Sequence, residues 1–204
     1  MRYTTIYNDP KTRRNITESC VYWDNAFTDE DIDNIVKYCE NFELTHGVTF
    51  SETDKEKLKD TRRSKISFHQ RNNDNAWIFD RLNFVIQSAN EMFYGFELNG
   101  YEAFQYTMYD ESENGMYDWH MDMGLGTREF EGEPRKLSLT LCLNDDFEGG
   151  EFQINTGKEN EPITPEVFKG RCLLFPSFVI HRVKPVTKGT RKSLVVWVEG
   201  PKFT

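Results

Sequence analysis

The spacing of hydrophobic positions along the chain changes near residue 100. Before that point, apolar residues recur at helical spacing in two segments. The first begins at a capping-box-like pair, Thr28 and Asp31, and continues to about Phe42. The second extends from about Asn75 to Tyr94, with Gly95 as its stop signal. The pattern therefore predicts two amphipathic helices in the first half of the chain.

After Gly100 the pattern is typical of short strands separated by turns. The seven predicted strands cover residues 102–109, 117–122, 136–143, 150–154, 171–175, 179–183 and 192–198. Glycines in the intervening turns permit positive φ angles, as in Glu148-Gly149-Gly150 and Lys188-Gly189. Strands of this number and spacing favour a sandwich or a barrel. No repeat or Pro-rich linker interrupts the sequence, so we expect a single domain over residues 1–204, with 1–100 supplying helical support and loops and 101–204 the β core.

Residues 43–65 are strongly polar and charged. A segment of this length and composition is typical of a surface loop, and two interpretations are open: a solvated loop or a lid over an active site.

Composition narrows the function classes. Among 204 residues, 25 Lys and Arg stand against 34 Asp and Glu, which gives a net charge of −9 and disfavours bulk nucleic-acid binding. A local basic cluster keeps that class open; its members are Lys57, Lys59, Arg62, Arg63 and Lys65. No apolar run approaches the ~18–20 residues that span a bilayer, and the N-terminus lacks an apolar signal core, so we expect a cytoplasmic protein without membrane contact. Four scattered cysteines without a CxxC pair disfavour a disulfide framework or a zinc finger.

Candidate metal ligands lie in the predicted strands. His120 and Asp122 are two residues apart, so on an extended strand their side chains project from the same face. His181 lies late in another strand of the same β region. Two imidazoles and one carboxylate are the ligand set of the facial triad in non-haem Fe(II) oxygenases. Without the second histidine, such a pair is more often a hydrogen-bonded surface pair.

Arg191 follows His181 by ten residues and heads an otherwise apolar strand. A guanidinium in such a strand needs an anionic partner, and a carboxylate gripped by two parallel hydrogen bonds suits it. Ser193 points to the same face and offers a further hydrogen bond. The alternative is that Arg191 pairs with a structural Asp or Glu.

The motifs from about Arg62 to Trp197 resemble the prolyl 4-hydroxylase-like superfamily of Fe(II)- and 2-oxoglutarate-dependent dioxygenases, and most of all its small bacterial and phage PKHD-type hydroxylases. The motifs that carry the resemblance are Gln105…Tyr109, Tyr117…His120-Met121-Asp122, Glu148-Gly149-Gly150-Glu151-Phe152, Phe175-Pro176-Ser177…His181-Arg182-Val183 and Gly189-Thr190-Arg191.

The resemblance implies a fold, a cofactor set and residue roles. The fold is mainly β with flanking helices (α+β): a double-stranded β-helix, or cupin-like jelly-roll, buttressed by the N-terminal helices, with the metal between two sheets near one open end. His120, Asp122 and His181 are implied to hold Fe(II), and Arg191 to bind the distal carboxylate of 2-oxoglutarate. Tyr109 is implied to hydrogen-bond this cosubstrate, and Ser193 is a weaker suggestion. O₂ is the other cosubstrate, and an ascorbate requirement is left open. One departure is Leu141, which stands where many relatives place a second tyrosine.

The implied reaction is hydroxylation, with a prolyl residue of a peptide or protein as the expected substrate. The substrate groove is expected beneath the 43–65 and 124–134 segments, where Tyr117, Trp119 and Phe130 either line it or belong to the core. Alternatives are hydroxylation of a free amino acid or another protein side chain, a non-catalytic jelly-roll binding module, and a zinc hydrolase with the same ligands. Arg191 disfavours the hydrolase, because hydrolysis does not require it. The sequence leaves the oligomeric state open.

Overall fold

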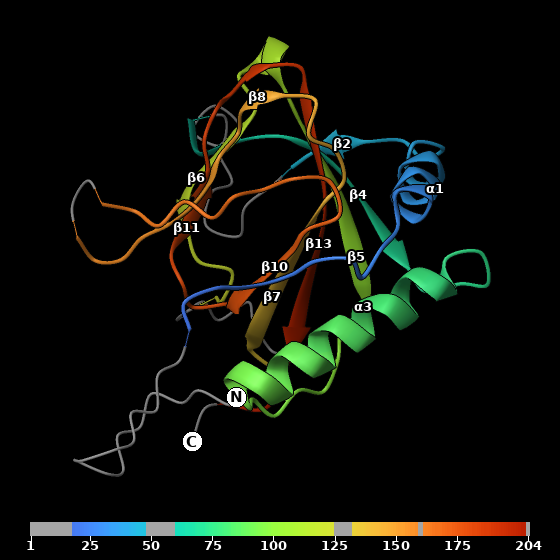
Figure 1. Ribbon diagram of the computed structural model, residues 1–204, viewed down its shortest axis with the longest axis vertical. Coiled ribbons are helices and arrows are strands. Elements are labelled where there is room, and N and C mark those ends of the chain that lie inside the picture. Colours follow the sequence, from blue (N-terminus) through green and yellow to red (C-terminus); the bar gives the residue numbers. More distant parts are fainter. Residues whose placement is uncertain (1–17, 48–59, 125–131, 159–160, 203–204) are drawn as a thin grey trace.

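The computed structural model describes residues 18–47, 60–124, 132–158 and 161–202. Two antiparallel sheets form a jelly-roll (Figure 1). The large sheet has the order β1 (Val21–Trp23), β10 (Cys172–Pro176), β7 (Arg135–Cys142), β13 (Thr190–Glu199), β5 (Ala103–Asp110), β4 (Lys65–Gln70) and β2 (Thr45–His46). The small sheet has the order β3 (Arg62–Arg63), β6 (Met116–His120), β11 (His181–Val183) and β9 (Phe152–Ile154). Strands β8 (Glu148–Gly149) and β12 (Val186–Lys188) pair separately. The predicted mainly β fold is confirmed.

Both predicted helices form. Helix α1 (Asp29–Cys39) begins at a capping box in which the Thr28 hydroxyl accepts from the Asp31 N–H (3.1 Å) and the Asp31 carboxylate accepts from the Thr28 N–H (2.8 Å). The helix ends at Cys39, three residues before the predicted end at Phe42, which is exposed. Helix α3 (Ala76–Ala89) continues as a π-helical turn (Asn90–Tyr94), and Gly95 ends it in the left-handed conformation (φ 66°), as predicted.

The large sheet separates an apolar layer from a polar interior. On β7, Leu137, Leu139 and Leu141 belong to the core that contains the buried faces of α1 and α3. Ser138 and Thr140 alternate with these leucines and therefore face the small sheet. Figure 1 shows both helices on one side of the large sheet and strands β6 and β11 on the other. The helices thus cover one face, and the opposite face is available for a site.

Some sequence expectations are corrected. The 43–65 segment is not one uninterrupted loop, because strand β2 lies at its start and β3 near its end; residues 48–59 are outside the described ranges. Strand β4 was not predicted. In the basic cluster, Arg62 is buried with its guanidinium 4.7 Å from the centre of the Tyr117 ring, whereas Lys57 and Lys59 lie outside the described residues. Because Arg62 is buried, the predicted basic cluster is not exposed along its whole length.

The four cysteines carry free thiols, and Cys39, Cys142 and Cys172 are buried. Across the described ranges, no helix has both the length and the apolar character needed to cross a membrane.

Candidate metal centre and anion pocket

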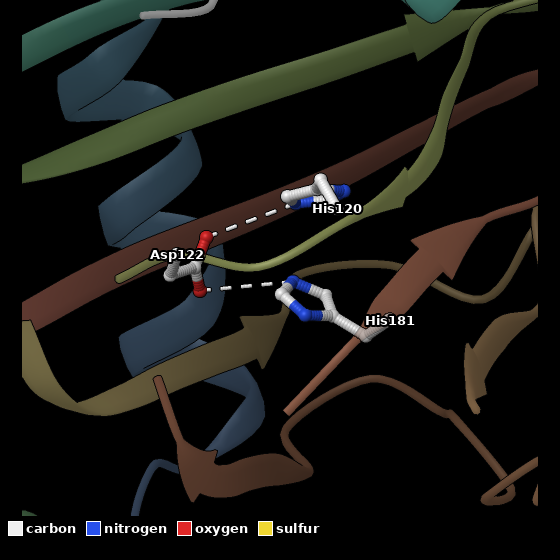
Figure 2. A group of neighbouring side chains, drawn as sticks. All are labelled: His120, Asp122 and His181. Atoms are coloured by element: carbon white, nitrogen blue, oxygen red, sulfur yellow. Dashed lines mark ion pairs between the residues drawn. The ribbon is translucent and has the colours of Figure 1, made fainter. Parts of the chain in front are cut away.

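Three predicted ligands meet between the sheets (Figure 2). His120 ends β6 and His181 begins β11, and the two residues are direct partners across the strand pair, with ring centres 4.2 Å apart. Asp122 lies two residues beyond β6, where its N–H donates to the Ser177 carbonyl (2.9 Å). Its Oδ1 is 3.7 Å from His120 Nε2 and its Oδ2 is 3.6 Å from His181 Nε2. The predicted strand through Asp122 therefore ends at His120, yet the three side chains converge.

The proton positions of both imidazoles follow from their backbone partners. His120 Nδ1 lies 2.7 Å from the Asp118 carbonyl, and His181 Nδ1 lies 2.9 Å from the Val179 carbonyl. A carbonyl only accepts, so each Nδ1 carries a proton, and in the neutral form of each ring the lone pair is then on Nε2, which faces Asp122. Burial, followed by the proximity of His181, lowers the pKa of His120 to about 3, so this ring is neutral at physiological pH.

Asp122 is ionised and held in place. Burial raises the pKa of Asp122, but the hydrogen bond from Ser138 is among the contacts that more than offset it, and the net pKa is lowered. Ser138 Oγ donates to Asp122 Oδ2 (2.7 Å) and lies 2.9 Å from Ser177 Oγ. Ser138 was not among the residues predicted from the sequence. The signal was the alternation of leucines with Ser and Thr in residues 136–143, which marks one polar face.

Aromatic rings fix the orientation of both imidazoles. The Tyr117 ring stacks on His120, with centres 3.4 Å apart and planes at 11°. The Phe175 ring centre lies 4.5 Å from that of His181. The imidazole planes are therefore packed before any ligand binds.

This donor set fits a divalent cation. When both rings are neutral, two Nε2 lone pairs and a carboxylate converge, and a cation between them neutralises their repulsion. All three ligand atoms lie within 4.8 Å of one another. Imidazole and carboxylate in a two-to-one ratio suit Fe(II).

Arg191 lies deep in the same interior. It pairs with Tyr109 across β13 and β5, and only 1 % of its surface is exposed. Its Nη1 donates to Ser193 Oγ (3.2 Å), whereas its buried Nε has no hydrogen-bond partner. In the described parts of the chain, no Asp or Glu forms an ion pair with Arg191. The guanidinium therefore fits an anionic group entering the interior, such as a carboxylate.

One pocket contains all six residues predicted from the sequence: Tyr109, His120, Asp122, His181, Arg191 and Ser193. Several other lining residues had no site role in the sequence analysis, among them Gln105, Thr140, Phe152, Phe175 and Trp197. Leu141 faces the helical core instead, so its side chain does not stand in the place of a pocket tyrosine. Of the three candidate groove aromatics, Tyr117 lines the pocket, Trp119 packs against Arg182 with the guanidinium 4.3 Å from its ring centre, and Phe130 lies outside the described residues.

Fold and site together define a class: a jelly-roll whose interior carries a two-histidine, one-carboxylate cluster beside a buried arginine. Residues 104–199 match the model of the 2OG-Fe(II) oxygenase superfamily. This region of the chain is similar to the proteins of that superfamily.

Individual proteins are similar to the chain in sequence or in fold. A PKHD-type hydroxylase of Alteromonas mediterranea is 30% identical over 92 residues, which cover 43% of this chain and 40% of the relative. The chain spans about two fifths of the length of the curated relatives it matches. A Pseudomonas putida prolyl-4-hydroxylase shares the fold at a TM-score of 0.69 with 17% identity, covering 89% of this chain and 92% of that one. A Trichoplax adhaerens prolyl hydroxylase was solved with a hypoxia inducible factor peptide fragment. It shares the fold at a TM-score of 0.71 with 16% identity, covering 89% of this chain and 84% of that one.

Proposed function

We propose that the protein is an Fe(II)- and 2-oxoglutarate-dependent dioxygenase that hydroxylates a prolyl residue in a peptide or protein. The observation that carries this proposal is that one pocket contains both a site suited to a cation and a site suited to an anion. The converging ligand atoms of His120, Asp122 and His181 suit a cation, and a buried Arg191 without an acidic partner among the described residues suits an anion. An iron centre with a dicarboxylate cosubstrate satisfies both.

In this proposal the three clustered residues would hold Fe(II), and 2-oxoglutarate and O₂ would be the cosubstrates. When bound, the iron supplies the redox chemistry that couples decarboxylation of 2-oxoglutarate to succinate with hydroxylation of the substrate. Asp122 supplies the single negative charge, and Ser138 keeps its carboxylate aimed at the centre. The backbone carbonyls of Asp118 and Val179 hold the histidines in the ligating tautomer.

Arg191 is assigned to the distal carboxylate of 2-oxoglutarate. Its Nε is free for one hydrogen bond, and the Ser193 hydroxyl, which accepts from Nη1, keeps its own proton for a second. Tyr109 faces the same guanidinium, with 5.6 Å between its ring centre and the guanidinium carbon. Phe152, Phe175 and Val183 line the pocket and keep water away from the reacting groups.

Names of similar proteins support a prolyl substrate: one structural neighbour is a prolyl-4-hydroxylase and another was solved with a peptide fragment. We place the protein in the cytoplasm, acting through one domain over residues 1–204. The proposed cofactors are Fe(II), 2-oxoglutarate and O₂, with ascorbate as an optional addition.

The test is oxygenation of a peptide by the purified protein supplied with Fe(II), 2-oxoglutarate and O₂. A panel of proline-containing peptides is compared with the same peptides carrying alanine at proline, and with the Asp122→Ala protein. The proposal predicts that only the proline peptides gain one oxygen atom, with equimolar succinate, and only with Asp122 present. Oxygenation of a free amino acid or of another side chain contradicts the prolyl assignment, and absence of succinate contradicts the oxygenase assignment.

A further inference from the structure

The outer edge of strand β4 is only partly covered. Strand β2 pairs with Lys65 and Ile66 and no further along β4. The Gly47 N–H donates to the Ser64 carbonyl (2.8 Å), which makes that pair a hydrogen-bonded one. Backbone groups alternate sides along an antiparallel strand, so Ile66 and Phe68 also direct their N–H and C=O toward this edge. Among the described residues, no strand pairs with the backbone N–H and C=O groups of Phe68 on this edge.

Large aromatic side chains flank this edge on both faces of the sheet. Phe68 pairs with Gln105, which lines the metal pocket, so its ring is on the pocket face. It is 59% exposed, and its centre lies 6.5 Å from that of Trp197, another pocket residue. Phe42 is 46% exposed on the opposite face, where its ring centre lies 4.7 Å from that of His69. Two exposed phenylalanines beside an unpaired backbone edge are typical of a binding surface.

A groove of about 600 Å³ follows the edge, lined among others by Tyr38, Phe42, Phe68, Gln70 and Glu102. Glu102 is exposed and forms no ion pair with any residue in the described ranges. Arg71, the cation of this groove, is 3.0 Å from Asp80 and thus already paired. The net charge of the whole chain is −9. Local and overall charge therefore both favour a basic partner.

We infer that the outer edge of β4 docks the polypeptide substrate as an added strand. An apolar residue of the substrate packs on Phe68, the neighbouring residue faces Phe42, and a nearby Lys or Arg meets Glu102. Because Phe68 adjoins Trp197 at the metal pocket, a segment bound along β4 continues toward the triad. The inference rests on the proposed function and makes it more specific: the substrate is an extended, basic and apolar polypeptide, and not a free amino acid.

The probe is a displayed library of random dodecapeptides selected on the full-length protein. We expect enriched peptides with adjacent apolar residues and a neighbouring Lys or Arg. Their dissociation constants are then measured by fluorescence anisotropy. Phe68→Ala is expected to weaken binding roughly tenfold or more. Phe84→Ala is the matched control, because Phe84 is 61% exposed on α3 and away from this edge, and it should bind as the wild type does.

Two readouts report strand addition itself. Amide exchange at Phe68 should slow when the peptide binds, because its N–H gains a partner. N-methylation of the peptide backbone should weaken binding at every second position only, since alternate N–H groups face β4. Both readouts use the wild-type protein, so misfolding of a variant does not affect them.

Binding is measured without turnover, which separates this inference from the proposed function. Peptide binding that depends on Phe68, in a protein that makes no succinate, supports the docking edge and contradicts the oxygenase. An active oxygenase whose enriched peptides bind equally to Phe68→Ala, or leave Phe68 exchange unchanged, contradicts the docking edge. A selection that enriches no peptide also contradicts it.

Discussion

At the scale of single residues, Arg191 is a buried cation with no acidic partner among the described residues. Moving a cation out of water costs several kcal/mol unless a partner compensates. In the described residues the compensation consists of the Ser193 hydroxyl and the face of the Tyr109 ring. A carboxylate that pairs with the guanidinium therefore gains a strong, charge-assisted contact with little side-chain ordering.

Replacement of Arg191 by methionine should remove that contact and preserve the volume. We expect 2-oxoglutarate to bind roughly 100-fold more weakly, as measured by calorimetry with Mn(II) in place of Fe(II). Lys192→Met is the matched control on the same strand, because Lys192 pairs with Glu40 at the surface. Equal 2-oxoglutarate affinity in the Arg191 variant and the wild type would contradict the assigned role.

Ser138 offers a second test, aimed at the metal. Ser138→Ala removes the hydrogen bond to Asp122 Oδ2 and frees the carboxylate to rotate. We expect the affinity for Fe(II) or Co(II), measured by competition with a chelator, to fall about tenfold. Ser88→Ala on α3 is the control and should leave the metal affinity unchanged. An unaltered affinity in Ser138→Ala would show that the hydroxyl does not position Asp122.

The residues with strong chemical signals were predictable and their supports were not. His120, Asp122 and His181 are residue types that bind metals, and Arg191 is a charged group at the start of an apolar strand, so each attracts attention in the sequence. Ser138 and Gln105 are small or neutral, and either one is unremarkable on a strand exposed to water. Only the pairing of β7 with its neighbours places Ser138 beside Asp122. Sequence patterns carry no information on such cross-strand distances.

At the scale of elements, the start of α1 shows how local interactions stabilise a helix. The Asp31 carboxylate accepts from the Thr28 N–H and hydroxyl and lies 2.8 Å from Arg81 Nη1. Burial raises the pKa of Asp31, but these hydrogen bonds and the Arg81 charge outweigh it, and the pKa is lowered. A lowered pKa in the folded state stabilises the protein above the unfolded pKa of about 4 and stops doing so as the pH falls through the folded value.

Asp31→Asn should therefore destabilise the protein in a pH-dependent manner. At neutral pH we expect a loss of about 1 kcal/mol in the free energy of unfolding, measured with urea. The difference from the wild type should shrink toward zero as the pH falls below the folded pKa of Asp31. Asp33→Asn, which sits on the exposed side of the same helix, provides the comparison. A constant difference across the pH range would contradict the electrostatic explanation.

Elements were predictable in proportion to their length. Helices α1 and α3 and strands β5, β7 and β13 each contain enough residues for a period to appear. Strands β2, β3, β8 and β12 have two or three residues each, and their partners define them more than their own sequence does. Strand β4 was hidden because its sequence mixes charged, aromatic and polar residues on a partly open edge. The local pattern is weakest where tertiary pairing decides the structure.

At the scale of the whole molecule, the large sheet performs two tasks at once. Its helix-facing side is apolar and forms the core with α1 and α3. Its other side carries polar groups toward β6 and β11, where the triad lies. The site therefore bridges the two sheets: His120 and His181 come from the small sheet, and Arg191 from the large one. Ligands that contact both sheets should stabilise the packing of one sheet against the other.

Bound ligands should consequently raise the thermal stability of the entire domain. We expect Mn(II) together with 2-oxoglutarate to increase the unfolding midpoint by several degrees, and by more than either alone. The increase should disappear in Asp122→Ala, measured by differential scanning fluorimetry. An equal increase in that variant would place the metal elsewhere.

The central claim is that one pocket holds iron and 2-oxoglutarate for oxidative decarboxylation. The most direct measurement is succinate release after O₂ is admitted to the anaerobic protein supplied with Fe(II) and 2-oxoglutarate. We predict that the wild type releases succinate, with further stimulation by a peptide substrate. Asp122→Ala and Arg191→Met should release almost none at limiting 2-oxoglutarate, whereas Lys192→Met should match the wild type. Absence of succinate from a folded, iron-loaded wild type, or equal release by Asp122→Ala, would contradict the account.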